Sequence, residues 1–146
     1  MNDLLFEIDN IDYKATALHV KHFLDTKLPH ILRIANESPA YLCSPVMSDM
    51  PSSGHSGNSN EDKIVKYLNA KMILNSIAKA FKNCSQASFT ILKDKYISSL
   101  SDWQIAANMY CSKATYFRLR DRAYNEFADC FEVQQGGTDL HIYLHE

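Results

Sequence analysis

One stretch of the chain, residues 113–122, gathers cationic side chains that could bind a polyanion. Its charged residues are Lys113, Arg118, Arg120, Asp121 and Arg122. The whole 146-residue chain holds 15 Lys and Arg against 17 Asp and Glu, a formal charge of −2, so this basic excess is local. A guanidinium group matches the O6 and N7 acceptors of guanine, and lysine pairs with phosphate. The stretch is typical of a surface that contacts duplex DNA, or of a solvated helix face in which Asp121 pairs with Arg118 or another basic side chain.

The cationic stretch belongs to a predicted helix that is capped by Ser112 and runs to about residue 130. At about 100° per residue, its core side carries Tyr116, Leu119, Ala123, Phe127 and Cys130, and its opposite side carries Ala114, Arg118, Asp121 and Asn125. Arg118 is therefore the candidate for reading base edges, and Lys113 and Arg122 are candidates for phosphate contacts. Arg120 falls closer to the core side, so we expect it to pack or to form an ion pair. The candidate DNA-binding residues are Ser112, Lys113, Ala114, Thr115, Phe117, Arg118, Asp121 and Arg122.

Two residues of this face suit DNA and protein partners alike. Asp121 could orient Arg118 or accept a hydrogen bond from cytosine N4, but an acid also suits a face that meets protein. Phe117 could contact a thymine methyl group, or it could be an edge of the core. The residue types alone leave both kinds of partner open.

A shorter helix is predicted directly before this one, which gives a helix-turn-helix pattern. The segment Ser101-Asp-Trp-Gln104 has the residues of a capping box, and Ala106 supplies the small side chain needed where the two helices cross. The residues expected to seal the angle between the helices are Ile105, Ala106, Met109, Cys111, Tyr116 and Leu119. Tyr110 departs from the pattern, because it occupies the turn position at which glycine is most comfortable.

The rest of the chain is predicted to form helices on either side of a polar connector. Residues 12–36 carry an apolar stripe with helical spacing, and Pro29 predicts a kink or a break in the turn before it. Residues 38–60 hold three of the four prolines and two of the four glycines, so they are expected to form a connector on the surface. A central helix with a broad apolar stripe follows from residue 61, and Ser85 is expected to cap another helix.

These elements predict an all-α fold in four parts. The parts are an N-terminal helical segment (1–37), the connector (38–60), a central helix with the helix-turn-helix domain (61–132) and a tail (133–146). In the tail, Leu140, Ile142 and Leu144 alternate with polar residues. This alternation leaves a short strand and an induced helix both open, with the strand slightly favoured.

Several functional classes lack their sequence signatures. No GxSxG, HExxH, P-loop or Rossmann glycine pattern occurs, so we expect neither enzymatic activity nor a cofactor. The pairs His19 with His22 and His141 with His145 have no cysteine or carboxylate set at a recognised spacing, so no metal site is expected. The four cysteines form no CxxC motif, which favours a reduced protein with buried thiols. The acidic start and the lack of a long apolar run predict a cytoplasmic protein without a membrane span.

The order and spacing of these segments resemble the ArpU family of phage and prophage transcriptional regulators of Gram-positive bacteria. The C-terminal part of that family is similar to YISSLSDWQIAANMYCSKATYFRLRDRAYNEFA, and its helix-turn-helix is similar to region 4 of sigma factors. The resemblance continues in IDYKATALHVKHFLDTKLPHILRIA and in SP…MPSS…GNSNEDKIVKYLNA, so it covers residues 10–132.

The resemblance implies sequence-specific binding of double-stranded DNA and control of late phage genes in a bacterial host cell, with the helix at about 113–130 in the major groove. Residues that match the S-x-S-T-Y-Y-R-like stretch of the family are Ser112, Lys113, Thr115, Phe117 and Arg118, whereas Ala114 stands where a serine is usual. Because one helix-turn-helix buries a modest area, we expect a homodimer or a higher assembly on adjacent half-sites. The alternative is a helical module that turns the same face toward RNA polymerase or a packaging protein, without reading DNA.

Overall fold

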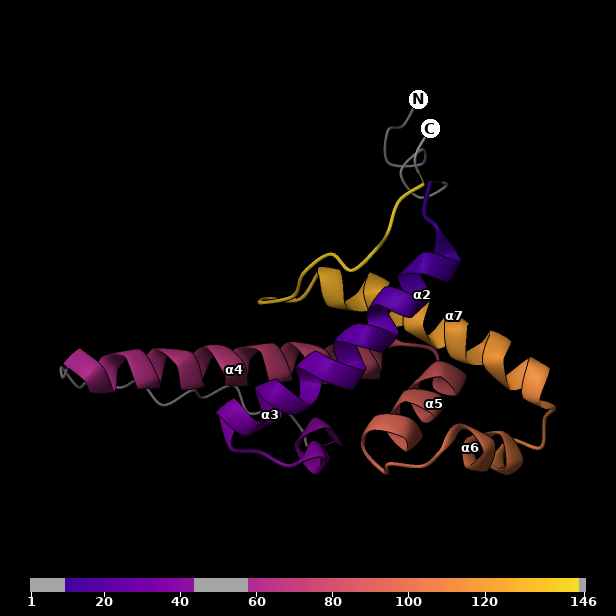
Figure 1. Cartoon of the computed structure of the whole chain (residues 1–146), viewed down its shortest axis with the longest axis horizontal. Coiled ribbons are helices and arrows are strands. Elements are labelled where there is room, and N and C mark those ends of the chain that lie inside the picture. The colour runs from indigo at the N-terminus through magenta and orange to yellow at the C-terminus, as the bar shows by residue number, and fades with distance from the viewer. Residues whose placement is uncertain (1–9, 44–57, 145–146) are drawn as a thin grey trace.

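The fold is all-α, as predicted, in the computed structural model, which describes residues 10–43 and 58–144 (Figure 1). Its α-helices are α2 (Tyr13–His22), α3 (Leu28–Ala35), α4 (Asn58–Asn83), α5 (Gln86–Tyr96), α6 (Asp102–Asn108) and α7 (Lys113–Glu132). A π-helical turn, η1 (Phe23–Lys27), joins α2 to α3, and a 3-10 helix, η2 (Pro39–Cys43), follows α3. In Figure 1, α2 and α3 run diagonally across α7 and α4, while α5 and α6 lie along the other half of α7.

The helix that contains Pro29 distorts without breaking. Asp12 caps its start, because its carboxylate accepts a hydrogen bond from the N–H of Ala15 at 3.0 Å. A proline has no N–H, and its ring collides with the preceding turn of an ordinary helix. The π-helical turn shifts the register just before the proline, since the N–H of Leu28 donates to the carbonyl of Phe23, five residues back. The predicted kink is therefore a local widening of the helix.

The predicted connector, residues 38–60, contains helical structure at both of its ends. η2 occupies its start, and α4 begins at Asn58, inside the stretch assigned to the connector. The hydroxyl of Tyr41 in η2 donates to Asn75 Oδ1 at 2.7 Å, which ties η2 to α4. Residues 44–57, which include both glycines of the connector, lie outside the described residues, and so does the expectation that they follow the surface.

Side chains from all the described helices form one core that holds α7 in place. The largest fully buried members are Tyr116, Tyr124, Phe81, Phe127, Phe131, Leu24, Leu28, Leu42, Leu74, Ile77, Ile91 and Leu92. The ring of Phe127 stacks on Phe131 with centroids 5.2 Å apart and meets Phe81 edge-on at 5.5 Å. Burying a side chain of this size contributes about 1.5–3 kcal/mol, so the core determines where α7 stands.

The C-terminal tail is extended and crosses the start of α2. The described tail, up to Leu144, contains no helix, and its only β-pairing is a single antiparallel bridge between Ile11 and Tyr143. The N–H of Asp12 donates to the carbonyl of Ile142 at 2.8 Å. Leu140 is buried, which accounts for part of the alternating pattern. The favoured prediction of a short strand is therefore reduced to one bridged pair.

Two further expectations have structural outcomes. Within the described ranges, none of the helices has both the length and the apolar character that crossing a membrane requires. The prediction of buried thiols is wrong for Cys43, which is exposed, and it holds in part for Cys84, Cys111 and Cys130, which are half-buried. All four thiols are free.

Candidate nucleic-acid interface

Local hydrogen bonds start α6 and α7 at the residues that the sequence predicts. Ser101 Oγ accepts from the N–H of Gln104 at 3.3 Å, and Gln104 Oε1 accepts from the N–H of Ser101 at 2.9 Å, so the capping box is complete. Ser112 Oγ accepts from the N–H of Thr115 at 3.1 Å and caps α7. Because the first amides of a helix lack partners of their own, these caps fix both starting points. Residues 109–112 form the turn between the two helices.

The turn contains a tyrosine in the left-handed conformation. Tyr110 has φ = +55°, and its side chain is 95% exposed. The N–H of Cys111 donates to the carbonyl of Ala106 at 3.3 Å, so α6 ends much as a glycine-terminated helix does. The lack of glycine therefore does not prevent the turn, but an L-residue in this conformation carries strain of about 1–2 kcal/mol.

Replacing Tyr110 by glycine should stabilise the protein. Glycine removes the strain but adds freedom to the unfolded chain, so we expect the free energy of unfolding to rise by about 0.5–1 kcal/mol in urea denaturation. Tyr110→Ala is the matched control, because it removes the exposed ring and keeps the strained φ. If both variants were equally stabilised, the ring and not the backbone would be the cause.

The predicted motif-core residues lie where α6 meets α7. Ile105, Ala106 and Tyr116 are buried, and Met109, Cys111 and Leu119 are half-buried against the core. Ala106 is 7% exposed, and its small side chain leaves room for Tyr116, whose ring is fully buried. Ala106 and Tyr116 both line the hollow between the two helices, so a small residue stands where α6 meets α7.

Asp102, the first residue of α6, is the centre of a polar cluster that the sequence did not reveal. Its carboxylate accepts hydrogen bonds from the hydroxyl of Tyr116 at 2.6 Å, from Lys95 Nζ at 3.2 Å and from Arg120 Nη1 at 3.2 Å. Burial disfavours the charged carboxylate, but the hydrogen bonds from Tyr116 and Lys95 and the two positive charges outweigh burial and lower the pKa of Asp102. Lys95 belongs to α5 and the other two donors belong to α7, so the cluster fixes α6 to both helices.

The predicted DNA-binding face is open to solvent over the first turns of α7. Ser112, Lys113, Ala114, Arg118 and Arg122 are exposed, and Thr115, Phe117 and Asp121 are half-buried. The guanidinium of Arg118 donates to Thr115 Oγ1 at 3.4 Å, and no carboxylate among the described residues forms an ion pair with it. Arg118 therefore presents most of its donors to solvent.

The acid on this face pairs with a neighbouring basic side chain, which is one of the two alternatives that the sequence left open, and not with Arg118. Asp121 Oδ1 lies 3.7 Å from Arg120 Nη2, so the alternative in which Asp121 neutralises Arg118 is not realised. The ion pair expected of Arg120 is present, both here and with Asp102. Arg122 is also paired, with Glu126 at 3.3 Å.

The ring of Phe117 is partly covered by cationic side chains. The guanidinium of Arg120 lies 4.7 Å from its centroid, and Lys113 Nζ lies 6.0 Å from it. The neighbouring ring of Tyr116 is 5.4 Å away, centroid to centroid. Phe117 is therefore an edge of the core that is still partly exposed, and a contact with a thymine methyl group stays a prediction.

The open face is shorter than the predicted recognition helix at 113–130. Asn125, expected on the outward side, donates from Nδ2 to the carbonyl of Tyr13 at 3.0 Å, and α2 packs against α7 from this point (Figure 1). The part of α7 that precedes this contact is residues 113–124, and the last exposed residue of the predicted face within it is Arg122. The predicted face is shortened because α2 packs against α7, although Tyr13 and Asn125 are more than a hundred positions apart in the sequence. Helical periodicity alone does not predict such a contact.

A hollow of ≈ 300 Å³ lies between α6 and the start of α7. It is lined by Asp102, Trp103, Ala106, Ala107, Cys111, Lys113, Tyr116 and Phe117. Trp103 is 73% exposed, although an indole of this size is usually largely covered. In the sequence, Trp103 stood out only as part of the predicted capping-box segment. The structure shows that it is exposed and lies beside the cationic face.

The fold and the site define an all-α protein in which two capped helices display a cationic edge. The chain belongs to the family described as "Protein of unknown function (DUF1492)", whose model matches residues 56–128, half of its length. It is also 26% identical over 124 residues, covering 84% of this chain and 90% of the relative, to "Putative autolysin regulatory protein ArpU" of Enterococcus hirae. Together these matches confirm the ArpU-like assignment. No solved structure matches the chain.

Proposed function

We propose that this protein is a regulator of transcription that binds double-stranded DNA sequence-specifically through the first turns of α7. The observation that carries the proposal is the exposed guanidinium of Arg118, which has no carboxylate partner among the described residues. Its neighbours Arg120 and Arg122 are both paired with acids. A guanidinium left free near the start of a capped helix is suited to pair with the O6 and N7 atoms of a guanine.

In this proposal each part of the open face has its own role. In this arrangement α6 crosses the DNA backbone, and the N-terminal turns of α7 enter the major groove. Lys113 and the Ser112 hydroxyl contact phosphate next to the helix N-terminus, whose partial positive charge favours an anion. Thr115 positions Arg118 through the hydrogen bond between their side chains. Arg118 contacts the base edge.

The regulated genes, in this proposal, are late genes of a phage or prophage in a bacterial cell. The relative in Enterococcus hirae carries a name that describes it as a regulatory protein. The ArpU-like assignment supports a regulatory role for this chain as well. A homodimer on two half-sites completes the proposal, because one such motif makes too few contacts for high specificity.

Selection of binding sites from a random duplex library tests the proposed function. We expect the full-length protein to enrich one motif, and its affinity for that motif to fall steeply with salt because phosphate contacts release counterions. A scrambled duplex of the same composition is the control. A library without an enriched motif and duplexes that are not retarded at low salt would contradict the proposal.

One observation favours a second candidate, a module that binds RNA polymerase or a phage packaging protein. The hollow beside α6 and the exposed Trp103 offer an apolar contact that DNA does not require. Trp103→Ala separates the two functions: a protein partner should be lost in a pull-down, whereas retardation of the selected duplex should persist. If Trp103→Ala lost binding to the duplex but kept the protein partner, Trp103 would belong to the DNA-binding surface.

A further inference from the structure

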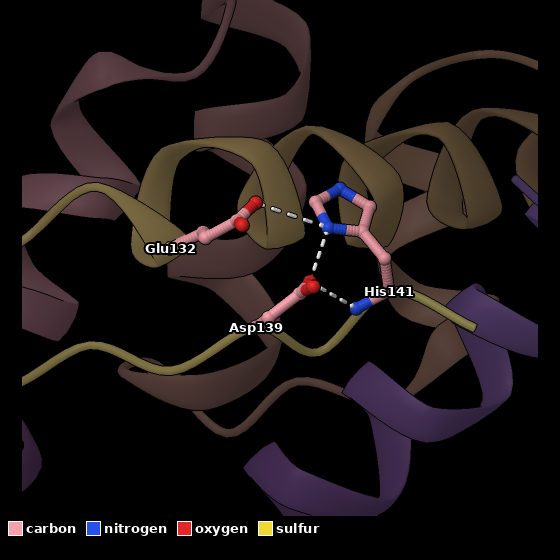
Figure 2. A group of neighbouring side chains, drawn as sticks. All are labelled: Glu132, Asp139 and His141. Carbon is pink, nitrogen blue, oxygen red and sulfur yellow. Dashed lines mark hydrogen bonds and ion pairs between the residues drawn. The ribbon is translucent and has the colours of Figure 1, made fainter. Parts of the chain in front are cut away.

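His141 lies among carboxylates, beside Glu132 and Asp139 (Figure 2). Glu132 is the last residue of α7, so this group is at the opposite end of the helix from Lys113 and the cationic face. Its side chain is 5% exposed, and its Nδ1 lies 2.6 Å from Asp139 Oδ1 and 3.3 Å from Glu132 Oε1. One ligand atom from each of these three residues falls within 4.8 Å of the others. We propose that Glu132, Asp139 and His141 bind a divalent transition-metal ion of the Zn²⁺ class.

A turn with two glycines brings the three side chains together. Gly136 has φ = +83°, and a Cβ on Gly137 would lie 1.9 Å from the carbonyl oxygen of Phe131. The chain therefore turns back tightly against the last turn of α7, at a place that only glycine fits. This reversal places Asp139 and His141, from the tail, beside Glu132, the last residue of α7.

The backbone on both sides of His141 is held by α2 and by Asp12, the residue that caps it. His19 Nδ1 lies 2.9 Å from the carbonyl of Leu140, and the N–H of Asp12 donates to the carbonyl of Ile142 at 2.8 Å. Because both neighbouring residues are fixed, the imidazole is positioned before any ion arrives. Such preorganisation lowers the entropy cost of binding a ligand.

A third acid, Asp129, sets which ring nitrogen faces the site. His141 Nε2 lies 2.7 Å from Asp129 Oδ1, on the side of the ring away from Glu132 and Asp139. A carboxylate that holds one ring nitrogen as N–H leaves the other nitrogen free to coordinate a metal, an arrangement common around histidine ligands. Asp129 is therefore a positioning residue that directs Nδ1 toward the two ligand carboxylates.

The charge balance of the group favours a divalent cation. Three carboxylates surround one imidazole, and no lysine or arginine among the described residues forms an ion pair with them. Even a protonated imidazole would offset only one of their three negative charges. A buried imidazole at the centre also distinguishes this group from acids that merely share a surface.

The donor set selects the class of ion. One imidazole nitrogen and two carboxylates suit Zn²⁺ and related ions, whereas Mg²⁺ and Ca²⁺ prefer oxygen ligands throughout. Tetrahedral Zn²⁺ with bonds of about 2.0–2.1 Å holds its ligand atoms roughly 3.3 Å apart. Glu132 Oε1 already has this spacing from Nδ1. Asp139 Oδ1 lies 2.6 Å from Nδ1 and also accepts from the N–H of His141 at 3.0 Å, so an ion bound here replaces the contact between Nδ1 and Asp139. Water completes the coordination, because both carboxylates open to solvent.

Calorimetric titration of the reduced full-length protein with Zn²⁺ tests the site. We expect one saturable site in the parent, binding at least ten-fold weaker in Glu132→Gln, and no saturable binding in His141→Gln. Zn²⁺ should also raise the thermal midpoint of the parent more than that of Glu132→Gln, because a ligand that binds the folded state stabilises it. Glu61→Gln, an exposed acid of α4, is the matched control and should bind as the parent does.

A second readout excludes other ligands and misfolding. Co²⁺ in place of Zn²⁺ should give d–d absorption without a thiolate charge-transfer band, because no cysteine belongs to the set. Far-ultraviolet circular dichroism of Glu132→Gln should match the parent, since His141 keeps Asp129 and Asp139. A thiolate band, unchanged affinity in Glu132→Gln, or no saturable binding by the parent would overturn the proposal. The DNA-binding proposal stands on the other end of α7, so neither result affects it.

Discussion

Arg118→Ala should weaken binding to the selected duplex by about 1–3 kcal/mol and relax the base preference at one position. The reason is that the guanidinium is exposed and has no acidic partner among the described residues. A planar guanidinium can donate two parallel hydrogen bonds, which matches the two acceptors on the edge of a guanine. The change should leave the fold intact, because the side chain supports no core contact. Retardation assays with the selected motif and its single-base variants measure both effects.

Lys113→Ala provides the comparison that identifies base reading. A lysine at the helix start contacts phosphate, so its loss should weaken all duplexes alike and reduce the salt slope by about one unit. Lys79→Ala, an exposed cation on α4, controls for overall charge and should leave binding unchanged. If Arg118→Ala and Lys113→Ala both bound the selected duplex as the parent does, this face of α7 would not be the DNA-binding surface.

The parts of the fold that follow from local chemistry were predictable. Ser101 and Ser112 cap helices because their hydroxyls accept from amides three residues on, so the sequence places both helix starts. The periodicity of α7 likewise placed Tyr116 and Phe127 in the core and Arg118 on the surface. Helix caps and apolar periodicity depend on residues only three to eleven positions apart. Such local patterns are sufficient to predict an all-α fold.

The contacts that join distant segments were not predictable in the same way. Helical spacing places Asn125 outward, and only the packing of α2 covers it. His141 meets Asp129 across twelve positions and a double-glycine turn, so no metal-ligand spacing is visible in the sequence. Residue types also left two kinds of partner open for Asp121, and the structure pairs it with the neighbouring Arg120 rather than with Arg118. These contacts depend on how helices and the tail pack against one another, and residue types alone do not determine that packing.

Asp102→Ala should destabilise the protein by about 2–3 kcal/mol at neutral pH, the largest effect on folding that we expect. The substitution leaves the hydroxyl of Tyr116 and the cations of Lys95 and Arg120 without their shared acceptor. Losing a hydrogen-bonded, half-buried carboxylate typically costs this much, because the donors stay desolvated. Urea denaturation measures the difference in the free energy of unfolding between parent and variant.

The pH dependence of that difference separates the charge of Asp102 from its packing. The folded protein holds the pKa of Asp102 below the ordinary value of 3.8, so the stabilisation is fully present above that value. The stabilisation is lost as the pH falls through the lower pKa of the folded state. The difference in the free energy of unfolding between the parent and Asp102→Ala should therefore become smaller in acid. Asp62→Ala, an exposed acid of α4, should show neither the cost nor the narrowing. If this difference in the free energy of unfolding stayed constant as the pH fell, the charge of the Asp102 carboxylate would not be what holds α6 in place. The orientation of α6 against the start of α7 would then rest on Ile105, Ala106 and Tyr116 alone.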